Sequence, residues 1–319
     1  MKFGGCLACG LDLETGDYHP ACAVRLFGTT SPPHFDLSIE DLDPLGREIV
    51  NNRLSVTGVQ KKLSLHMTPG TSVPGALGYG RLTLVGALGG THILKPPSIE
   101  YPEMPQVEHL TMLLASQCGI RVAAHGLIAG SEGSLSYITK RFDRHKKSKV
   151  AVEDLCQLSE LPTSNKYKST VERAGQIVRR FSSNPGDDAL RFFELIVFCF
   201  LTGNADMHLK NFSLMRSEDD LVSMTPAYDL VSTRLLISVN EDPEESAMPL
   251  NGKKSNLKKA DFAALGSNLK LPEKVVDRTL ERLRDTLPLW ERAVDRAILS
   301  DEQKRNYVTL LRERVARSR

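Results

Sequence analysis

Short stretches of alternating hydrophobic and polar residues follow one another after residue 54. Leu63 and Leu65 alternate with polar residues, and residues 81–85 repeat that pattern. Residues 91–94 form a short apolar stretch that two prolines close. Because successive side chains of a strand face opposite sides, a period of two predicts strands. The pattern therefore favours a β-rich region that extends to about residue 144.

Elsewhere the hydrophobic period is that of a helix. Residues 106–118 carry an apolar stripe, and Gly119 after them is typical of a helix end. After about residue 150 helices dominate. Residues 188–201 are apolar on nearly every face and predict a buried helix. Pro272 opens a further helix in the manner of a first helical residue, and residues 301–315 predict the last one.

These periods divide the chain into three expected parts. Residues 1–54 form a cap that contains cysteine and histidine, residues 55–148 a β-rich N-lobe, and residues 149–319 a helical C-lobe. The expected fold class is α+β, with a small β-rich lobe followed by a large helical lobe, as in two-lobed protein kinases. That plan alone does not identify a function.

Composition sets limits on the class of protein. The chain has 319 residues, 41% hydrophobic and 25% charged, enough for two lobes that each have a core. Its net charge of +2 argues against a dedicated nucleic-acid binder. The longest apolar run, residues 195–201, is too short to cross a bilayer, and no secretory signal opens the chain. Because six cysteines at this length do not indicate a disulfide framework, we expect a cytoplasmic protein with reduced thiols and no membrane contact.

The segment 203–212 carries the strongest chemical signal. It follows the predicted buried helix directly, so a rigid element would hold it. Phosphoryl transfer needs a carboxylate to accept the hydroxyl proton and an oxygen ligand for Mg²⁺ nearby, and protein kinases supply these as an Asp and an Asn with four residues between them. Asp206 and Asn211 have that spacing. Alone, the pair would equally suit turn and cap positions.

Three further residues complete a phosphate and metal site. Asp229 follows a stretch that predicts a strand pair, which would bring it and Asn211 to one Mg²⁺ ion. Lys95, at the end of a strand, would pair with the α and β phosphates of ATP, and Glu108 on the next helix would hold it. The alternatives are a solvated strand end for Lys95 and a surface position for Glu108.

Residues 54–63 combine one glycine, small hydroxyl residues and backbone amides ahead of the strands. They do not form a Walker A loop, but such a segment can line a phosphate site. The candidate ATP contacts in it are Val56, Thr57, Gly58, Val59, Gln60 and Lys61.

Taken in order, six segments of the chain resemble the HipA family, the Ser/Thr protein kinase toxins of bacterial type II toxin–antitoxin systems, in its short HipT-like form. Each segment is loose, but the ordered set is specific and spans roughly residues 18–265. The segments are residues 55–62, 91–97, 140–144, 153–157, 203–213 and 227–230.

The resemblance implies a role for each matching position. The catalytic base falls on Asp206, and the Mg²⁺ ligands fall on Asn211 and Asp229. The Lys that contacts ATP phosphates falls on Lys95. Residues 139–142 would line the adenine, and the remaining candidate ATP contacts are Lys140, Phe142, Glu108, His208 and Lys210. Lys140 departs from the family, which often has Glu there, so a side-chain contact at that position is not carried over. Within the catalytic loop, Lys210 would touch the transferred phosphate and His208 would hydrogen-bond the loop.

The resemblance also implies partners and regulation. Relatives phosphorylate a Ser of aminoacyl-tRNA synthetases and are neutralised by a small DNA-binding antitoxin, here a HipB-like protein. Only 54 residues precede Ser55, so the N-terminal subdomain of longer relatives is expected as a separate small HipS-like protein. Relatives carry a regulatory phospho-Ser at the position of Ser55, and short forms use two positions. Ser55 and Thr57, two apart on one face of an extended segment, are therefore the expected autophosphorylation sites.

Four residues of the cap have the types and spacing of a zinc site. They are Cys6, Cys9, His19 and Cys22, which form C-x2-C and H-x2-C pairs. A reduced, metal-free cap is the alternative.

Two other functions remain open. A small-molecule or lipid kinase would use the same residues. A non-catalytic regulatory subunit that binds ATP is the second, and the complete set of Lys95, Asp206, Asn211 and Asp229 argues against it.

Overall fold

The computed structural model describes residues 5–30, 32, 33, 35, 62–68, 80–85, 90–131, 133–145 and 148–319. The chain divides into two compact units, and the division falls within one helix, α3 (Met104–Gln117). Unit 1 comprises residues 1–109, 123–142 and 296–299. Unit 2 comprises residues 110–122, 143–295 and 300–319.

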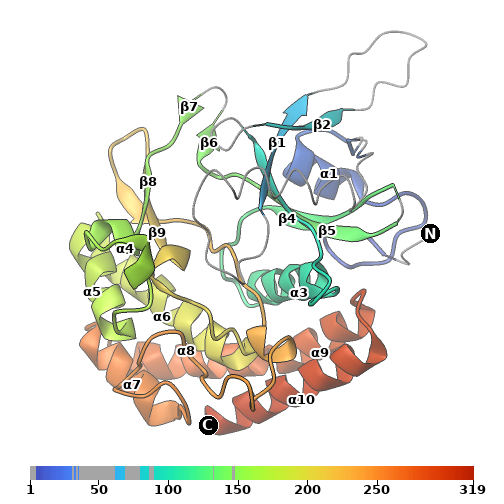
Figure 1. The fold of residues 1–319 in the computed structure, drawn as a ribbon. Helices are drawn as coiled ribbons and strands as arrows, with labels where there is room; N and C mark the ends of the chain where they lie inside the picture. Colours follow the sequence, from blue (N-terminus) through green and yellow to red (C-terminus); the bar gives the residue numbers. More distant parts are fainter. Residues whose placement is uncertain are drawn as a thin grey trace, which may run out of the picture. The chain divides into compact units, whose positions relative to one another are not determined.

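A five-stranded antiparallel sheet forms the centre of unit 1, in the strand order β2-β1-β3-β5-β4 (Figure 1). The strands are β1 (Leu63–Thr68), β2 (Arg81–Leu84), β3 (His92–Lys95), β4 (His125–Ala129) and β5 (Leu135–Lys140). The alternation of Leu63 and Leu65 with polar residues places both leucines in the core, where they are buried. Helix α1 (Pro20–Phe27) and the turn before it pack against this sheet through Leu7, Leu26 and Phe27. The strands expected from the period of two are confirmed.

Unit 2 is mostly helical and contains two small antiparallel sheets. The three-stranded sheet has the order β10-β9-β8, and the two-stranded sheet pairs β6 with β7. Its strands are β6 (Arg144–His145), β7 (Ser148–Lys149), β8 (Val152–Asp154), β9 (Ser213–Arg216) and β10 (Val222–Met224). Its helices are α4 (Leu155–Leu158), α5 (Val171–Phe181), α6 (Pro185–Thr202), α7 (Lys259–Asn268), α8 (Glu273–Asp285), α9 (Leu287–Arg296, the last residue of which falls in unit 1) and α10 (Asp301–Arg317). Three short 3-10 helices complete it: η1 (Thr163–Asn165), η2 (Leu209–Asn211) and η3 (Thr233–Leu235).

Helix α6 is the core element of unit 2. Nearly all its side chains beyond the first turn are buried, which confirms the helix expected over residues 188–201. The helix ends at Gly203, whose φ of 70° lies in the left-handed region that glycine adopts without cost. A Cβ atom there would also come within 2.7 Å of Leu310. The chain must therefore leave the helix at this residue and enter the predicted catalytic loop.

Two other expected helices are present with shifted starts. The helix expected over residues 106–118 is α3, and Gly119 follows it with a φ of 85°. Helix α8 begins at Glu273, so Pro272 is its N-cap and not its first helical residue.

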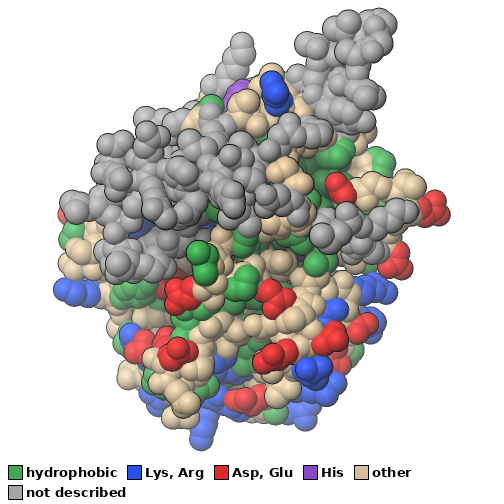
Figure 2. Space-filling view, turned by 45° about the vertical axis from the view of Figure 1, so that its right-hand side comes forward, with side chains coloured by type: hydrophobic (Ala, Val, Ile, Leu, Met, Phe, Trp, Pro, Cys, Tyr) green, Lys and Arg blue, Asp and Glu red, His purple; other side chains and the backbone are tan. Residues whose placement is uncertain are grey.

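Charged side chains of both signs are interspersed over the described surface seen in Figure 2, as the small net charge suggests. Among the described residues, none of the helices combines the length and the hydrophobicity that a membrane span requires.

Candidate functional site

Side chains hold the catalytic loop predicted at residues 203–212 through hydrogen bonds to its backbone. The Thr233 side chain on η3 accepts a hydrogen bond from the Ala205 N–H at 2.9 Å and donates one to the Gly203 carbonyl at 3.3 Å. The Asn204 side chain accepts from the Asp206 N–H at 3.1 Å. Side chains of unit 2 thus fix the chain from Gly203 to the N–H of Asp206.

Asp206 and Asn211 are brought into direct contact. The Asn211 side-chain amide donates to the backbone carbonyl of Asp206 at 3.0 Å, across the turn that η2 closes. Because that contact uses the amide nitrogen, the amide oxygen of Asn211 is the atom suited to a cation. The Asp206 carboxylate is half-buried and accepts a hydrogen bond from the Tyr167 hydroxyl at 2.8 Å.

The residue before Asp229, Tyr228, contacts the turn that carries Asn211. The Tyr228 hydroxyl donates to the Lys210 carbonyl at 2.9 Å and lies 2.6 Å from the Ser213 hydroxyl, so the segment that carries Asp229 runs next to the one that carries Asn211. Asp229 has a φ of 59°, a left-handed conformation that Asp adopts more readily than most residues. Backbone strain of this kind accumulates at functional sites.

His208 is a buried member of the same loop. Its ring meets the Tyr167 ring edge-on, with centroids 5.0 Å apart. Burial lowers the pKa of His208, although the carboxylates of Asp206 and Asp229 oppose that shift. Its buried Nδ1 has no hydrogen-bond partner among the described residues, so the expected roles of His208 as a loop hydrogen-bonder and as an ATP contact stay predictions.

Lys210 contacts a carboxylate in the structure. Its Nζ donates to Asp154 Oδ2 at 2.8 Å. Asp154 is also the N-cap of α4, where it forms a capping box with Gln157. Sequence reasoning gave no role to Asp154 or to Tyr167. The D-x-x-Q spacing of a capping box was a usable signal for Asp154, whereas nothing in the sequence singled out Tyr167.

Lys95 and Glu108 form an ion pair inside unit 1, as expected. Their side chains are 4% and 1% exposed, so neither occupies the surface position that was the alternative. The Lys95 Nζ also lies 5.3 Å from the centre of the Tyr137 ring. A contact of Lys95 with ATP stays a prediction.

The predicted adenine segment leaves the sheet at the end of β5. The N–H of Lys140 donates to the Ala124 carbonyl at 2.8 Å, and the Thr139 hydroxyl donates to the same carbonyl at 3.0 Å. The Arg141 N–H donates to the Thr91 carbonyl at 2.9 Å. These bonds hold the backbone of residues 139–141, and Phe142 follows. The adenine contact stays a prediction.

The expected phosphate loop lies outside the described residues. This applies to Ser55, Val56, Thr57, Gly58, Val59, Gln60 and Lys61.

By contrast, the four candidate zinc ligands Cys6, Cys9, His19 and Cys22 come together in unit 1.

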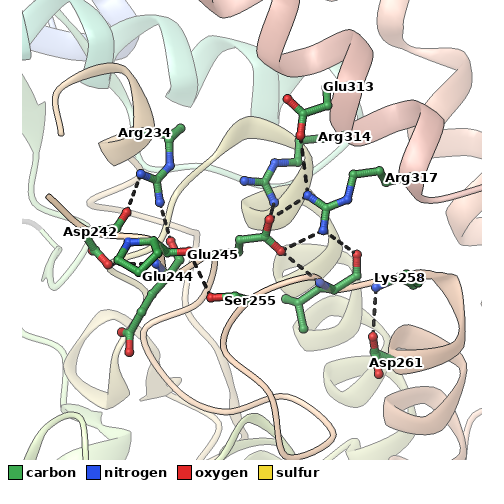
Figure 3. A network of polar contacts seen from close by, with 12 residues as sticks. Arg234, Asp242, Glu244, Glu245, Ser255, Lys258, Asp261, Glu313, Arg314 and Arg317 are labelled. Atoms are coloured by element: carbon green, nitrogen blue, oxygen red, sulfur yellow. Dashed lines mark hydrogen bonds and ion pairs between the residues drawn. The ribbon is translucent and has the colours of Figure 1, made fainter. Parts of the chain in front are cut away.

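A polar network in unit 2 joins Arg234, the loop after it and the C-terminal part of α10 (Figure 3). The Arg234 N–H donates to the Gly203 carbonyl at 3.1 Å, and its guanidinium donates to two carbonyls of the following loop, those of Asp242 and Glu244. Next to them, Glu245 accepts from Arg317 at 2.6 Å and forms a 2.7 Å ion pair with the buried Arg314 of α10. The loop that follows the catalytic segment is thereby tied to the last helix.

Comparison with known proteins places this arrangement in a class. The model of the HipA-like C-terminal domain family matches residues 54–290. The chain is 31% identical over 278 residues to the protein Y4dM of Sinorhizobium fredii, covering 83% of this chain and 64% of that protein. It is 29% identical over 259 residues to the serine/threonine-protein kinase toxin HipA of Shewanella oneidensis, covering 74% of this chain and 56% of that protein.

A solved structure gives the same result for the fold. A chain of the complex of Shewanella oneidensis HipA, HipB and operator DNA superposes with a TM-score of 0.67 at 24% identity, covering 83% of this chain and 64% of that one. The fold is therefore the expected α+β fold of two-lobed kinases of the HipA type.

The chain belongs to the HipA-like C-terminal domain family, because the family model matches most of its length. It spans less than two thirds of the length of each of these two curated relatives.

Proposed function

We propose that this chain is an ATP-dependent Ser/Thr protein kinase of the HipA type that acts as the toxin of a toxin–antitoxin system. The observation that carries the proposal is the arrangement of the catalytic loop. It presents a half-buried Asp206 carboxylate, clamps Asn211 to the backbone of that residue, and lies beside the segment that carries Asp229.

In this proposal Asn211 and Asp229 hold Mg²⁺. The donors fit such an ion, because a carboxylate and an amide oxygen are hard ligands that leave positions open for phosphate oxygens and water. Bound Mg²⁺ would neutralise charge on the phosphates of ATP. Lys95, held by Glu108 in unit 1, would contact the α and β phosphates, and residues 139–142 would contact the adenine.

Asp206 serves as the base. Its carboxylate accepts the proton of a substrate hydroxyl while the hydroxyl oxygen forms a bond to the γ-phosphorus of ATP. The bond between that phosphorus and the β–γ bridging oxygen breaks, and ADP leaves. The Tyr167 hydroxyl, which donates to Oδ1 of Asp206, orients the carboxylate for this step.

The family resemblance supports the finer parts of the proposal. The substrate would be a Ser in an aminoacyl-tRNA synthetase. A HipB-like antitoxin would neutralise the kinase, since the solved relative is in a complex with HipB and operator DNA, and a small HipS-like protein would be a second partner. Autophosphorylation would fall on Ser55 and Thr57 and lower activity, because the added negative charge would repel ATP.

The test is incubation of the purified chain with labelled ATP, Mg²⁺ and either a lysate or purified synthetases. Asp206→Asn keeps the shape of the side chain but cannot accept the proton, so transfer should fall by about 100-fold or more. Asp219→Asn is the matched control, because Asp219 is exposed on the turn between β9 and β10. Intact mass should show one or two phosphates on the wild type and none on Asp206→Asn or on Ser55→Ala with Thr57→Ala.

Other outcomes would overturn parts of the proposal. Transfer by Asp206→Asn at the wild-type rate would exclude this residue as the base. Label found only on metabolites or lipids would favour a small-molecule kinase, and ATP binding without any transfer would favour a regulatory subunit.

A further inference from the structure

We propose that the N-terminal turn of this protein binds a structural Zn²⁺ ion through Cys6, Cys9, His19 and Cys22. The proposal is independent of the kinase activity, since none of these residues belongs to the catalytic loop or to the Lys95–Glu108 pair. It rests on the geometry of the four side chains and on what surrounds them.

The four ligand atoms lie close together. The three sulfur atoms and one ring nitrogen are all within 4.8 Å of one another. With Zn–S bonds of about 2.3 Å and a Zn–N bond of about 2.0 Å, a tetrahedral site separates its ligand atoms by about 3.5–3.8 Å. The Cys9 Sγ lies 3.3 Å from the His19 Nδ1, near the value for one such edge. One ion of this size therefore fits among four ligand atoms that lie within 4.8 Å of one another.

His19 is oriented by its second ring nitrogen. The Nε2 lies 3.0 Å from the carbonyl oxygen of Asp12, an acceptor, so Nε2 carries the proton. The lone pair of Nδ1 then faces the sulfur atoms. A hydrogen bond from the outer nitrogen of a histidine to a backbone carbonyl is the usual arrangement at zinc sites, where it fixes the ring and its tautomer.

The backbone around the cysteines forms a tight turn that is suited to a metal. The Gly10 N–H donates to the Cys6 carbonyl at 2.8 Å, and the Cys6 N–H donates to the Leu11 carbonyl at 2.8 Å. Gly10 has a φ of 69°, which lets the chain reverse directly after Cys9. The His19 N–H points to the Cys6 Sγ at 3.4 Å, a contact that stabilises a thiolate.

This turn packs on the sheet of unit 1. The Leu127 N–H on β4 donates to the Leu7 carbonyl at 2.7 Å, and the Tyr18 hydroxyl donates to the Leu127 carbonyl. Gly126 allows the close approach, because a Cβ atom there would lie 3.1 Å from the Leu7 carbonyl oxygen. At the far end of α1 the His92 ring of β3 lies 2.9 Å from the Leu26 carbonyl oxygen.

The ion would therefore hold a cap on the two strands β3 and β4. Four protein ligands leave no open position for a substrate, so the site is structural and not catalytic. A short turn of this kind has a small hydrophobic core, and a metal bond is one way to stabilise it. All six cysteines are free thiols in the structure, so the metal does not compete with a disulfide there.

The test measures the zinc content of the 319-residue chain, purified under reducing conditions. The protein is dialysed first against buffer that contains Zn²⁺ and then against buffer without it. We expect one equivalent per chain in the wild type and in Cys118→Ser. Cys118 is the matched control, because its thiol is buried directly after the end of α3 and donates to the Ala115 carbonyl, as serine also can. The Cys9→Ser with Cys22→Ser double variant should retain no zinc.

A second measurement does not depend on the folding of that variant. In the wild type, Co²⁺ in place of zinc should give the visible spectrum of a tetrahedral site together with thiolate charge-transfer absorption, and His19→Cys should keep the metal and change that spectrum. A wild-type chain that binds neither metal, or zinc that persists in the double cysteine variant, would overturn the proposal. A wild-type chain that binds zinc but transfers no phosphate would count against the proposed kinase function alone.

Discussion

The ion pair between Lys95 and Glu108 gives a quantitative test of unit 1. Glu108→Gln removes the negative charge and nearly preserves the volume, so the buried Lys95 loses the charge of this carboxylate. The two side chains are 4% and 1% exposed, so water screens their interaction little. Two charges about 4 Å apart interact by about 4 kcal/mol at an effective dielectric constant of about 20. Removing one partner of a buried pair costs about 3–5 kcal/mol, and we expect about 3 kcal/mol for Glu108→Gln.

A double variant tests whether the cost arises from leaving one charge of the pair buried without the other. Lys95→Met with Glu108→Leu replaces both charges by apolar groups of similar size, which should bring stability back to within about 1 kcal/mol of the wild type. The exposed pair Lys254–Glu244, 3.0 Å apart with side chains 32% and 42% exposed, is the control. There, Glu244→Gln should change the free energy of unfolding by at most about 1 kcal/mol.

Urea unfolding followed by two probes measures these differences. Far-ultraviolet circular dichroism reports on both units. The single tryptophan, Trp290, is fully buried on α9 within unit 2 and donates to the Leu114 carbonyl, so its fluorescence reports on that unit. A shift in the dichroism alone would show that unit 1 unfolds independently. If Glu108→Gln lowers the free energy of unfolding no more than Glu244→Gln does, burial does not strengthen the Lys95–Glu108 interaction.

Two further predictions concern histidine and the catalytic loop. Burial lowers the pKa of His92 to about 4, that of His109 to about 3, and that of His125 also. The unfolded chain binds protons at these sites below about pH 6.5, so stability should be full above that pH and fall by about 1.4 kcal/mol per pH unit and histidine as the pH drops toward 4. Unfolding experiments at several pH values measure that slope, and a flat profile would contradict the assignment. Thr233→Val removes both hydrogen bonds to the catalytic loop, so it should lower the free energy of unfolding by about 1 kcal/mol. It should also lower kcat more than it raises KM for ATP. A change in KM alone would show that Thr233 acts on ATP binding and not on the catalytic loop.

The sequence alone determined the local elements, because their signals lie within a few neighbouring residues. The period of two around Leu63 and Leu65 predicted a strand of unit 1, and the apolar run from residue 188 predicted α6. The spacing of Asp206 and Asn211 selected the loop that follows it. The order of the six segments indicated the family that the comparisons then showed.

Only the tertiary structure decided which distant residues meet. Tyr167 is 39 positions from Asp206 and Asp154 is 56 from Lys210, so neither contact leaves a trace in local periodicity. The burial of the Lys95–Glu108 pair likewise depends on the first turns of α3 meeting β3 within unit 1, which the local pattern around neither residue encodes. The four zinc-ligand candidates were visible as spacing, but their convergence required the turn to close and α1 to dock on β4. Contacts of this kind depend on the positions of whole elements in space, which hydrophobic patterns along the chain do not encode.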